Sequence, residues 1–433
     1  MGKKTNERPN VVFIMADDQG PWAAGCYGNE EIRTPNIDRL AGEGLLFENF
    51  FCTSPVCSPA RASILTGKLP SQHGVHDWIR EGNMPPNAAE YLEGMRCYTD
   101  ILDERGWQCG LSGKWHLGNS MSPQAGFSHW FCHRKGAGSY IDQPMVRNGT
   151  LQQTEGYLTD VITDEALRFL DEKRESPFYL GVHYTAPHSP WTGHPEAIVA
   201  SYEGCRFASC PQEERHPWAG PLTRLSYGNR EHLKGYFAAV TAMDAAIGRI
   251  LDKLERLGLQ ERTLVIFTSD NGFSCGQHGF WGKGNGTFPI NMYENSVKVP
   301  MLVRHPGVIP AGRRTDALMS QYDIFPTLLE HLGLAEIGNY NGPGRSHCDV
   351  WQGKGGKERE DVVVYDEYGP VRMIRTRQWK YVHRHPFGVH ELYDLKRDPG
   401  EKQNRIEDQS CRAVVGELRA RLSRWFERYV NTA

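Results

Sequence analysis

The sequence predicts an α/β fold in which helices sandwich a large, mixed and mostly parallel sheet, followed by a small C-terminal α+β subdomain. The first observation is a set of short apolar runs without polar alternation, typical of strands buried on both faces of a parallel sheet. These runs lie at 10–16, 178–184, 264–269 and 299–307. The second is that helical segments alternate with the runs up to about residue 335. The third is a glycine-rich stretch at 339–361, beyond which strand-like segments and turns follow one another.

Helices are expected where apolar residues recur at three- and four-residue spacing. Such segments lie at 159–173, 235–258 and 323–333, and the chain ends in another one. Within 34–51 we place Leu45 and Leu46 on a further short helix. The glycine-rich stretch then divides the chain into a main domain, residues 1–345, and a C-terminal subdomain, residues 346–433, with a small antiparallel sheet and a terminal helix.

Length and charge limit the classes of function. A chain of 433 residues can form a large core with a smaller appended unit. Its formal net charge of −3 provides no basic field for nucleic acid, so local positive groups must hold any anionic ligand. No run of about 18 apolar residues is present, so we expect no membrane span.

The start of the chain and its cysteines bear on the compartment. The start, MGKKTNERPN, is charged and does not resemble a secretory signal. We therefore expect a cytoplasmic protein, or a periplasmic or secreted one whose signal peptide has been removed. The eleven cysteines are scattered and form no Cys-x-x-Cys pair, so we expect no zinc site of that type and mostly reduced thiols.

Two of the predicted strands end in oxygen-bearing side chains. Asp17 and Asp18 follow the first strand, and Asp270 and Asn271 follow the third. One such pair alone is common as a loop cap. Because ligand sites in open α/β sheets lie at the carboxyl ends of strands, we expect the two pairs to meet. Three carboxylates and an amide suit a hard cation, Ca²⁺ or else Mg²⁺.

The segment CSPAR places Cys57 four residues before Arg61, with Pro59 between them. The simplest interpretation is a buried cysteine near the start of a helix. A thiol is, however, a poor ligand for a hard cation, so an unmodified cysteine does not suit a place beside the acidic pairs. The alternative is a cysteine that is converted into another nucleophile.

Ordered motifs along nearly the whole chain decide between these interpretations. CSPARASILTGKLPSQHG (57–74) and GWQCGLSGKWHLG (106–118) match the two signatures of type I, formylglycine-dependent sulfatases, which belong to the alkaline phosphatase superfamily. Two positions depart from the second signature: Trp107 stands for the usual Tyr, and Cys109 for Ser or Thr. PNVVFIMADDQG, YTAPHSP, TSDNGFSCGQHGFWGKG and ELYDLKRDPGEKQN match further blocks in order. The chain therefore resembles this family, which implies an alkaline phosphatase-like fold and hydrolysis of sulfuric esters.

The resemblance implies a chemistry for residue 57. A maturase oxidises the Cys57 side chain to Cα-formylglycine, an aldehyde that hydrates to a geminal diol. One diol oxygen attacks sulfur, and the other loses its proton as the carbonyl re-forms and sulfate leaves. A serine could attack, but it could not expel sulfate in this way. The resemblance also implies Ca²⁺ held by a diol oxygen of residue 57 and by Asp17, Asp18, Asp270 and Asn271.

The resemblance assigns roles to five further residues. Arg61 steadies the diol, Lys114 and Lys283 bind sulfate oxygens, and His188 donates a proton toward the leaving oxygen. His116 takes the proton that restores the aldehyde. Lys114 and His116 point the same way if their stretch is extended. We interpret His183, His73 and His278, by contrast, as structural.

Three loops are candidates for substrate recognition: 76–87, 130–149 and 190–197. They mix aromatic and charged side chains, among them Asp77, Trp78 and Arg134. These groups favour a sulfated carbohydrate over a small aryl sulfate as the substrate. Two other functions stay open at this point. One is a phosphonate or phosphate ester hydrolase on the same scaffold, which Asn271 disfavours because such relatives tend to have Asp-His there. The other is a catalytically silent protein that binds anionic glycans.

Overall fold

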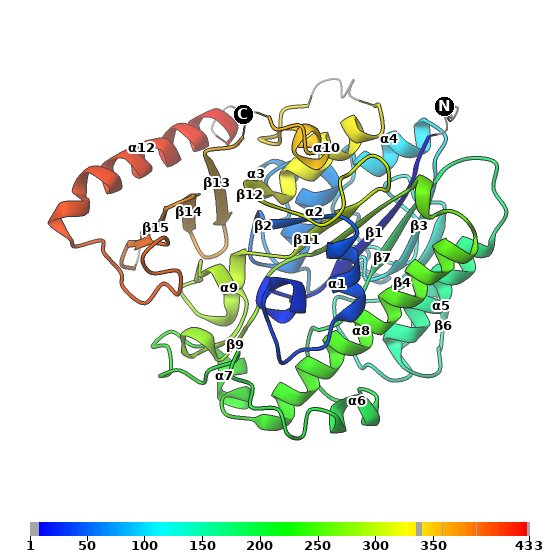
Figure 1. Ribbon diagram of the computed structural model, residues 1–433, viewed down its shortest axis with the longest axis horizontal. Helices are drawn as coiled ribbons and strands as arrows, with labels where there is room; N and C mark the ends of the chain where they lie inside the picture. Colours follow the sequence, from blue (N-terminus) through cyan, green and yellow to red (C-terminus); the bar gives the residue numbers. More distant parts are fainter. Residues whose placement is uncertain (1–7, 335–339, 357, 387, 431–433) are drawn as a thin grey trace.

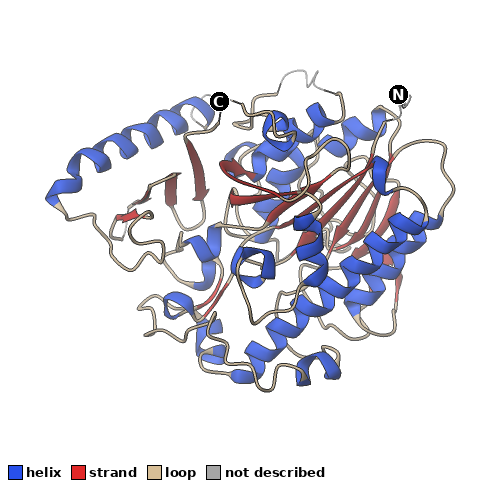
Figure 2. Ribbon diagram, viewed as in Figure 1, coloured by secondary structure: helices blue, strands red, loops and turns tan. Residues whose placement is uncertain are grey.

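The computed structural model describes residues 8–334, 340–356, 358–386 and 388–430. The expectations for the charged start, residues 1–7, and for parts of the glycine-rich stretch lie outside the described residues. Within them, a ten-stranded sheet forms the centre of the molecule (Figures 1 and 2), in the order β12-β2-β11-β8-β1-β7-β3-β4-β5-β6. The strands are β1 (Asn10–Ala16), β2 (Leu45–Phe51), β3 (Gln108–Gly113), β4 (His129–His133), β5 (Met145–Arg147), β6 (Thr150–Gln152), β7 (Phe178–His183), β8 (Thr263–Ser269), β11 (Met301–Arg304) and β12 (Arg313–Ser320).

The four predicted strands are present, and the sheet is mixed and mostly parallel as expected. β1 is parallel to both β7 and β8, with Val12 opposite Leu180 and Val265. Every residue of β1 is buried, which explains its unbroken apolar run. β11 is antiparallel to β8 and to β2. Several strands of this sheet, β3 among them, carry weaker patterns and were not expected.

The prediction for 34–51 was wrong for Leu45 and Leu46. The helix α1 (Pro35–Gly42) ends before them, and both residues begin strand β2. The close approach of the backbones explains the change, because a Cβ on Gly44 would lie 2.2 Å from the carbonyl oxygen of Val303. β2 thereby pairs with β11, where it buries its apolar side chains.

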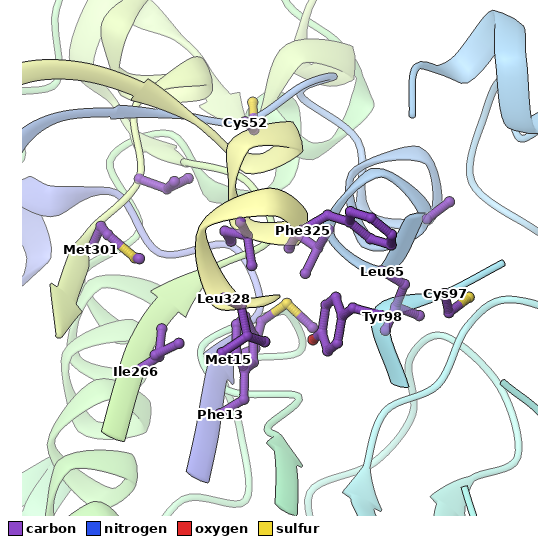
Figure 3. Close-up of a cluster of buried hydrophobic side chains, with 14 of the residues drawn as sticks. Phe13, Met15, Cys52, Leu65, Cys97, Tyr98, Ile266, Met301, Phe325 and Leu328 are labelled. Atoms are coloured by element: carbon purple, nitrogen blue, oxygen red, sulfur yellow. The ribbon is translucent and has the colours of Figure 1, made fainter. Parts of the chain in front are cut away.

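Helices cover both faces of the sheet. Side chains alternate along β1, so Val12 and Ile14 pack toward α1, α5 (Leu158–Asp171) and α8 (Arg230–Arg256). Phe13 and Met15 pack on the other face toward α2 (Cys57–Thr66), α4 (Tyr98–Glu104) and α10 (Ile324–His331) (Figure 3). Asp17 continues the alternate series after Phe13 and Met15, so it lies on the same face of the sheet, which α2 covers.

The long helix is longer than predicted at its start. Asn229 caps α8 by accepting hydrogen bonds from the backbone N–H groups of Glu231 and His232, a contribution of about 1 kcal/mol. None of the helices in the described parts of the chain is long and apolar enough to cross a membrane. The shorter described helices are α3 (Pro70–His73), α6 (Glu196–Ala200), α7 (Pro221–Ser226), α9 (Glu294–Val297) and α11 (Cys348–Trp351).

Strands β9 (Ser274–Cys275) and β10 (Trp281–Gly282) form a small two-stranded antiparallel sheet. The C-terminal part forms a separate four-stranded antiparallel sheet, with strands β13 (Asp361–Asp366), β14 (Val371–Thr376), β15 (Trp379–Arg384) and β16 (Glu391–Asp394). Helix α12 (Arg412–Tyr429) packs Leu418, Leu422 and Phe426 against it. Lys380 links this sheet to the main domain, since its Nζ lies 2.8 Å from the carbonyl oxygen of Met292. The dividing point between residues 345 and 346 stays a prediction.

Candidate active site

The two acidic pairs meet at the carboxyl ends of β1 and β8. Ala16 and Ser269 are partners in the parallel ladder, so the residues that follow them leave the sheet side by side. Asp18 adopts a positive φ of 70°, and its backbone N–H faces Asp270 Oδ1 at 3.3 Å. Asn271 Nδ2 donates to Asp18 Oδ1 at 2.7 Å. Two short loops that are about 250 residues apart in the sequence therefore form one acidic floor.

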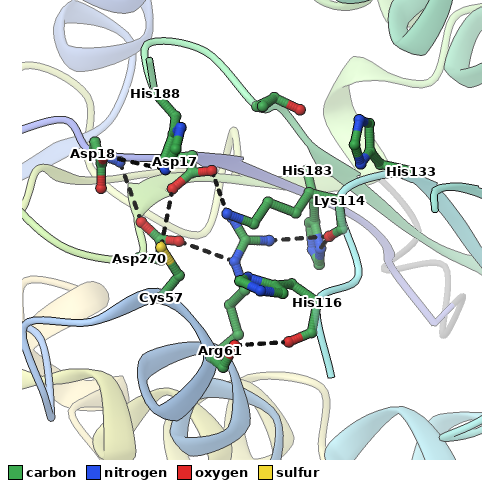
Figure 4. Close-up of polar contacts among 12 residues, drawn as sticks. Asp17, Asp18, Cys57, Arg61, Lys114, His116, His133, His183, His188 and Asp270 are labelled. Atoms are coloured by element: carbon green, nitrogen blue, oxygen red, sulfur yellow. Dashed lines mark hydrogen bonds and ion pairs between the residues drawn. The ribbon is translucent and has the colours of Figure 1, made fainter. Parts of the chain in front are cut away.

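Cys57 is the first residue of α2 and points into this floor (Figure 4). Its Sγ lies 3.4 Å from Asp17 Oδ1 and 2.6 Å from Lys283 Nζ. Burial raises the pKa of the Cys57 thiol well above its usual range, and the carboxylate of Asp17 raises it further, although Lys114 and Lys283 oppose the rise. An unmodified thiol is therefore a weak nucleophile at this position.

Two buried cations are bonded to the acids. Lys114 Nζ lies 2.5 Å from Asp17 Oδ2, and Arg61 Nε lies 2.9 Å from Asp270 Oδ2. Arg61 Nη1 also donates to the carbonyl oxygen of Lys114 at 3.0 Å. Burial raises the pKa of the Asp17 carboxyl, but Lys114 and the other nearby cations lower it more, so the pKa is below its usual range. The Asp17 carboxylate therefore stays charged beside Lys114, as a buried charge does only when it is paired.

His116 lies beside the cations on a tight turn. Strand β3 ends at Gly113 and His116 has a φ of 58°, so the stretch from Lys114 to His116 is not extended. Its Nε2 lies 3.0 Å from the carbonyl oxygen of Ile79, and its buried Nδ1 has no hydrogen-bond partner within the described residues. Burial, followed by Lys114 and Arg61, holds the pKa of His116 well below its usual range. The ring is thus a neutral base with one available nitrogen.

His188 and Lys283 both face Asp18. His188 Nδ1 is 2.7 Å from the carbonyl oxygen of Ser189, which directs Nε2 toward Asp18 Oδ2 at 3.8 Å. Lys283 Nζ lies 2.7 Å from Asp18 Oδ1. Burial lowers the pKa of Lys283, but Asp18 and Cys57 together raise it well above its usual range. Asn291 fixes the Lys283 backbone by donating from Nδ2 to its carbonyl oxygen at 3.0 Å.

The donor atoms fit a hard divalent cation. Ligand atoms of Asp17, Asp18, Asp270 and Cys57 all lie within 4.8 Å of one another. Asn271 adds a buried Oδ1 that has no hydrogen-bond partner in the described parts of the chain. Oxygen donors suit Ca²⁺ or Mg²⁺, whereas the sulfur of Cys57 does not. The acidic cluster can therefore hold a metal, and its one unsuitable donor is residue 57.

A cavity of about 530 Å³ opens above Cys57. The loop 76–87 lines it with Trp78, Ile79, Arg80 and Asn83, and the loop 130–149 lines it with Lys135, Gly136 and Ala137. Of the three substrate residues predicted in these loops, only Trp78 lines the cavity, and His188 and Lys283, predicted to contact the sulfate end of the substrate, line it as well. Asp77 instead accepts a hydrogen bond from the backbone of Trp78 at 2.7 Å, and Lys135 takes the place expected for its neighbour Arg134.

Other parts of the cavity wall were missed. Leu222, Phe273 and Asn285 line it and were not predicted from the sequence, although Phe273 lies within the motif that carries Asp270 and Asn271. The loop 190–197, by contrast, contributes no lining residue; Trp191 is buried and donates from Nε1 to the carbonyl oxygen of Pro187 at 2.9 Å. Loops and very short helices carry too little periodicity to mark such side chains in the sequence, so only the folded chain brings them together.

A buried side chain that joins two parts of the floor was also missed, since no motif marks it. Gln321, in the turn η6 (Gln321–Asp323), accepts a hydrogen bond from the backbone N–H of Thr53 at 3.0 Å. Its Nε2 donates to the carbonyl oxygens of Ser269 and Asp270 at 3.1 and 2.7 Å. Gln321 thus ties the segment that leads to Cys57 to the loop that carries Asp270.

The three histidines interpreted as structural have partners away from the acids. His183 Nδ1 lies 3.2 Å from the carbonyl oxygen of Lys114. His73 Nε2 lies 3.1 Å from Ser63 Oγ, and the ring of His278 stacks on Tyr293 with centroids 3.9 Å apart. Each therefore supports a neighbouring segment.

Comparison with known proteins identifies the family of this chain. Residues 9–334 match the family model described as Sulfatase, and residues 276–428 match the model of the C-terminal part of N-sulphoglucosamine sulphohydrolase. The chain belongs to the sulfatase family. It is accordingly a sulfuric ester hydrolase with the alkaline phosphatase-like fold of that family.

Several relatives of this sulfatase have names that specify a sulfated sugar as the substrate. It is 28% identical to the N-acetylglucosamine-6-O-sulfatase of Bacteroides thetaiotaomicron, over 93% of this chain and 83% of that protein. It is 32% identical to the N-acetylgalactosamine-6-sulfatase of Homo sapiens, over 75% of this chain and 62% of that protein. Its structure matches, with a TM-score of 0.85 and 26% identity, one solved with its substrate D-glucosamine-2-N,6-O-disulfate, covering 98% of this chain and 99% of that one.

Proposed function

We propose that this sulfatase removes a sulfate ester from a carbohydrate, using formylglycine made from Cys57 together with Ca²⁺. One observation carries the proposal: Cys57 Sγ lies 3.4 Å from Asp17 and 2.6 Å from Lys283, among oxygen donors that suit a cation no thiol would bind well. Conversion to formylglycine replaces that sulfur with oxygen. The names of the sugar-specific relatives support the choice of a carbohydrate.

Formylglycine and Ca²⁺ would each supply defined chemistry. Once hydrated, formylglycine offers two hydroxyls on one carbon, so that one can displace the alcohol at sulfur and the other can lose its proton as the aldehyde re-forms and sulfate departs. Asp17, Asp18, Asp270 and Asn271 would hold the cation, which attracts the anionic ester and lowers the pKa of a nearby hydroxyl.

The side chains of the protein bind the sulfate group. Lys114 and Lys283 come from different segments and are both within hydrogen-bond reach of the acidic floor. Their fixed positive charges balance the charge on sulfate oxygens without rearrangement during the reaction. Arg61 is paired with Asp270 and so keeps that carboxylate in place.

Two histidines handle the protons. His188 donates a proton from Nε2 to the leaving sugar oxygen, because Nδ1 is engaged with the carbonyl oxygen of Ser189. His116 is held neutral, so its Nδ1 accepts the proton that the second hydroxyl releases. The donor and the acceptor are therefore different residues, and each is oriented by a backbone carbonyl.

A sulfate-release assay tests the proposal. The protein is produced with a formylglycine-generating maturase and given glucosamine 6-sulfate, 4-nitrophenyl sulfate, phenyl phosphonate monoester and choline sulfate in the presence of Ca²⁺. We expect kcat/KM for the sulfated sugar to exceed that for each other ester by at least about tenfold, a difference of about 1.4 kcal/mol. Faster hydrolysis of the phosphonate, or no sulfate release from any sugar by converted protein, would contradict the proposal.

A further inference from the structure

We propose that the cavity contains a second-anion subsite, formed by Arg80 and Lys135, that binds a sulfate or carboxylate group elsewhere on the same saccharide. This inference rests on the proposed function and specifies its substrate: a sugar with one anionic group besides the sulfate that is removed. No catalytic role is assigned to either side chain. Both lie above the floor, and both line the cavity.

The charges of the cavity wall support such a subsite. Asp18 is the one acidic residue among the described lining residues, and Lys283 is already paired with it at 2.7 Å. Neither Arg80 nor Lys135 has an acidic partner within 4 Å in the described parts of the chain. Asp77 accepts a hydrogen bond from the backbone N–H of Trp78, and it interacts with Arg80 only through space, beyond ion-pair distance. Two positive charges therefore remain for an anionic ligand.

Arg80 and Lys135 lie on two different loops, and both loops contact the imidazole ring of His116. Ile79, directly before Arg80, places its carbonyl oxygen 3.0 Å from His116 Nε2. Gly136, directly after Lys135, packs so closely that a Cβ there would lie 2.2 Å from the same nitrogen. Both loops thus adjoin His116, and the two cations lie one residue from their respective contacts. When the sulfate of a saccharide lies at Cys57, the rest of the saccharide extends past these two loops toward the mouth of the cavity.

The surroundings hold the side chain of Arg80 and the backbone of Lys135. The guanidinium of Arg80 lies 4.6 Å from the ring centroid of Trp78, so one face is stacked while its edge stays open to pair with two oxygens. The backbone of Lys135 is anchored by the buried His133, whose Nδ1 lies 2.6 Å from the carbonyl oxygen of Lys135. Such anchoring reduces the ordering cost of binding.

Kinetics on matched substrates test the subsite. The substrates are N-acetylglucosamine 6-sulfate, whose only charged group is the sulfate, glucosamine 2-N,6-O-disulfate and a 6-sulfated disaccharide with a uronic acid. The variants are Arg80→Gln, Lys135→Gln and the double variant, with Lys396→Gln, an exposed lysine of the C-terminal part, as the control. We expect each loss of charge to raise KM about tenfold for a two-anion substrate, with kcat within about threefold. KM for the singly sulfated sugar should change by less than about threefold, and Lys396→Gln should change nothing.

The substrate arms separate the sources of the second anion. If KM of the Arg80 and Lys135 variants rises only for the disulfate, the ligand of the subsite is a second sulfate. If KM rises only for the disaccharide, the ligand is a carboxylate. Equal changes for singly and doubly charged substrates, or no change for either doubly charged one, would overturn the proposal. Calorimetry of the same ligands with Cys57→Ala versions of each variant measures the subsite without turnover. If converted wild-type protein releases no sulfate, the proposed function fails, while this binding experiment still decides on the subsite.

Discussion

The floor and the rim of the cavity are built in opposite ways. On the floor, Asp17, Lys114 and Arg61 are buried, ion-paired and held at the ends of strands or on a helix. On the rim, Trp78 is 40% exposed, and Arg80 and Lys135 have no acidic partner among the described residues. Paired, rigid charges suit a reaction that must be the same for every substrate. Open charges can change between relatives at little cost in stability, which suits the choice of substrate.

The largest expected effect comes from the centre of the floor. Cys57→Ser leaves the fold intact but removes the precursor of formylglycine and, with it, the second hydroxyl that expels sulfate. Sulfate release should fall by at least about 10⁴-fold, as on loss of a nucleophile. Cys26→Ser, at a half-buried cysteine outside the cavity, should retain full activity. If Cys57→Ser turned over substrate nearly as fast as the parent protein, catalysis would not depend on a group made from Cys57, and the floor would not have the role assigned to it.

The next effect tests the cation. Asp270→Asn replaces a carboxylate ligand of the cation by a neutral amide. The substitution should lower kcat/KM by about 10³-fold and abolish the rise in melting temperature that Ca²⁺ produces. It also leaves Arg61 without its buried partner, a cost of about 3–5 kcal/mol in the free energy of unfolding. Asp103→Asn, at an exposed acid, is the control. A Ca²⁺ response that survives in Asp270→Asn would contradict the assigned cation site.

His188 lies between floor and rim, and its effect should depend on the substrate. A sugar alkoxide is a poor leaving group that needs a proton, whereas 4-nitrophenolate leaves without one. His188→Ala should therefore lower kcat about 10²–10³-fold on a sulfated sugar but less than about tenfold on 4-nitrophenyl sulfate. Equal losses on both substrates would show that His188 does not donate the proton.

Gln321 should give the smallest effect. Gln321→Met removes three buried hydrogen bonds that tie the Cys57 segment to the Asp270 loop. We expect the Ca²⁺ concentration for half-maximal activity to rise about tenfold and the melting temperature to fall, since each lost bond costs about 1 kcal/mol. A fall in melting temperature with an unchanged Ca²⁺ midpoint would give Gln321 a purely structural role.

The floor could be predicted from the sequence, and the rim largely could not. Asp17 and Asp270 follow unbroken apolar strands, so the rule for parallel sheets is enough to bring them together. Leu222 lies on the short helix α7, Asn285 on a single 3₁₀ turn and Phe273 in the loop after Asn271, and their positions depend on the packing of distant parts. The prediction of a helix at Leu45 and Leu46 was wrong for a related reason. Their conformation is decided by the pairing of β2 with β11 and not by the spacing of the apolar residues around them. His116 shows the same limit, because its positive φ is set by the turn after β3.

Residue 57 should not be a cysteine in the active protein, and peptide mass measures this most directly. Trypsin releases residues 40–61 as one peptide that contains both Cys52 and Cys57, so Cys52 serves as an internal control. In protein made with a competent maturase, we expect a peptide about 18 Da lighter than the unmodified one, with a single alkylatable thiol at Cys52. A peptide of unmodified mass with two alkylatable thiols, from protein that nevertheless releases sulfate, would contradict the formylglycine proposal.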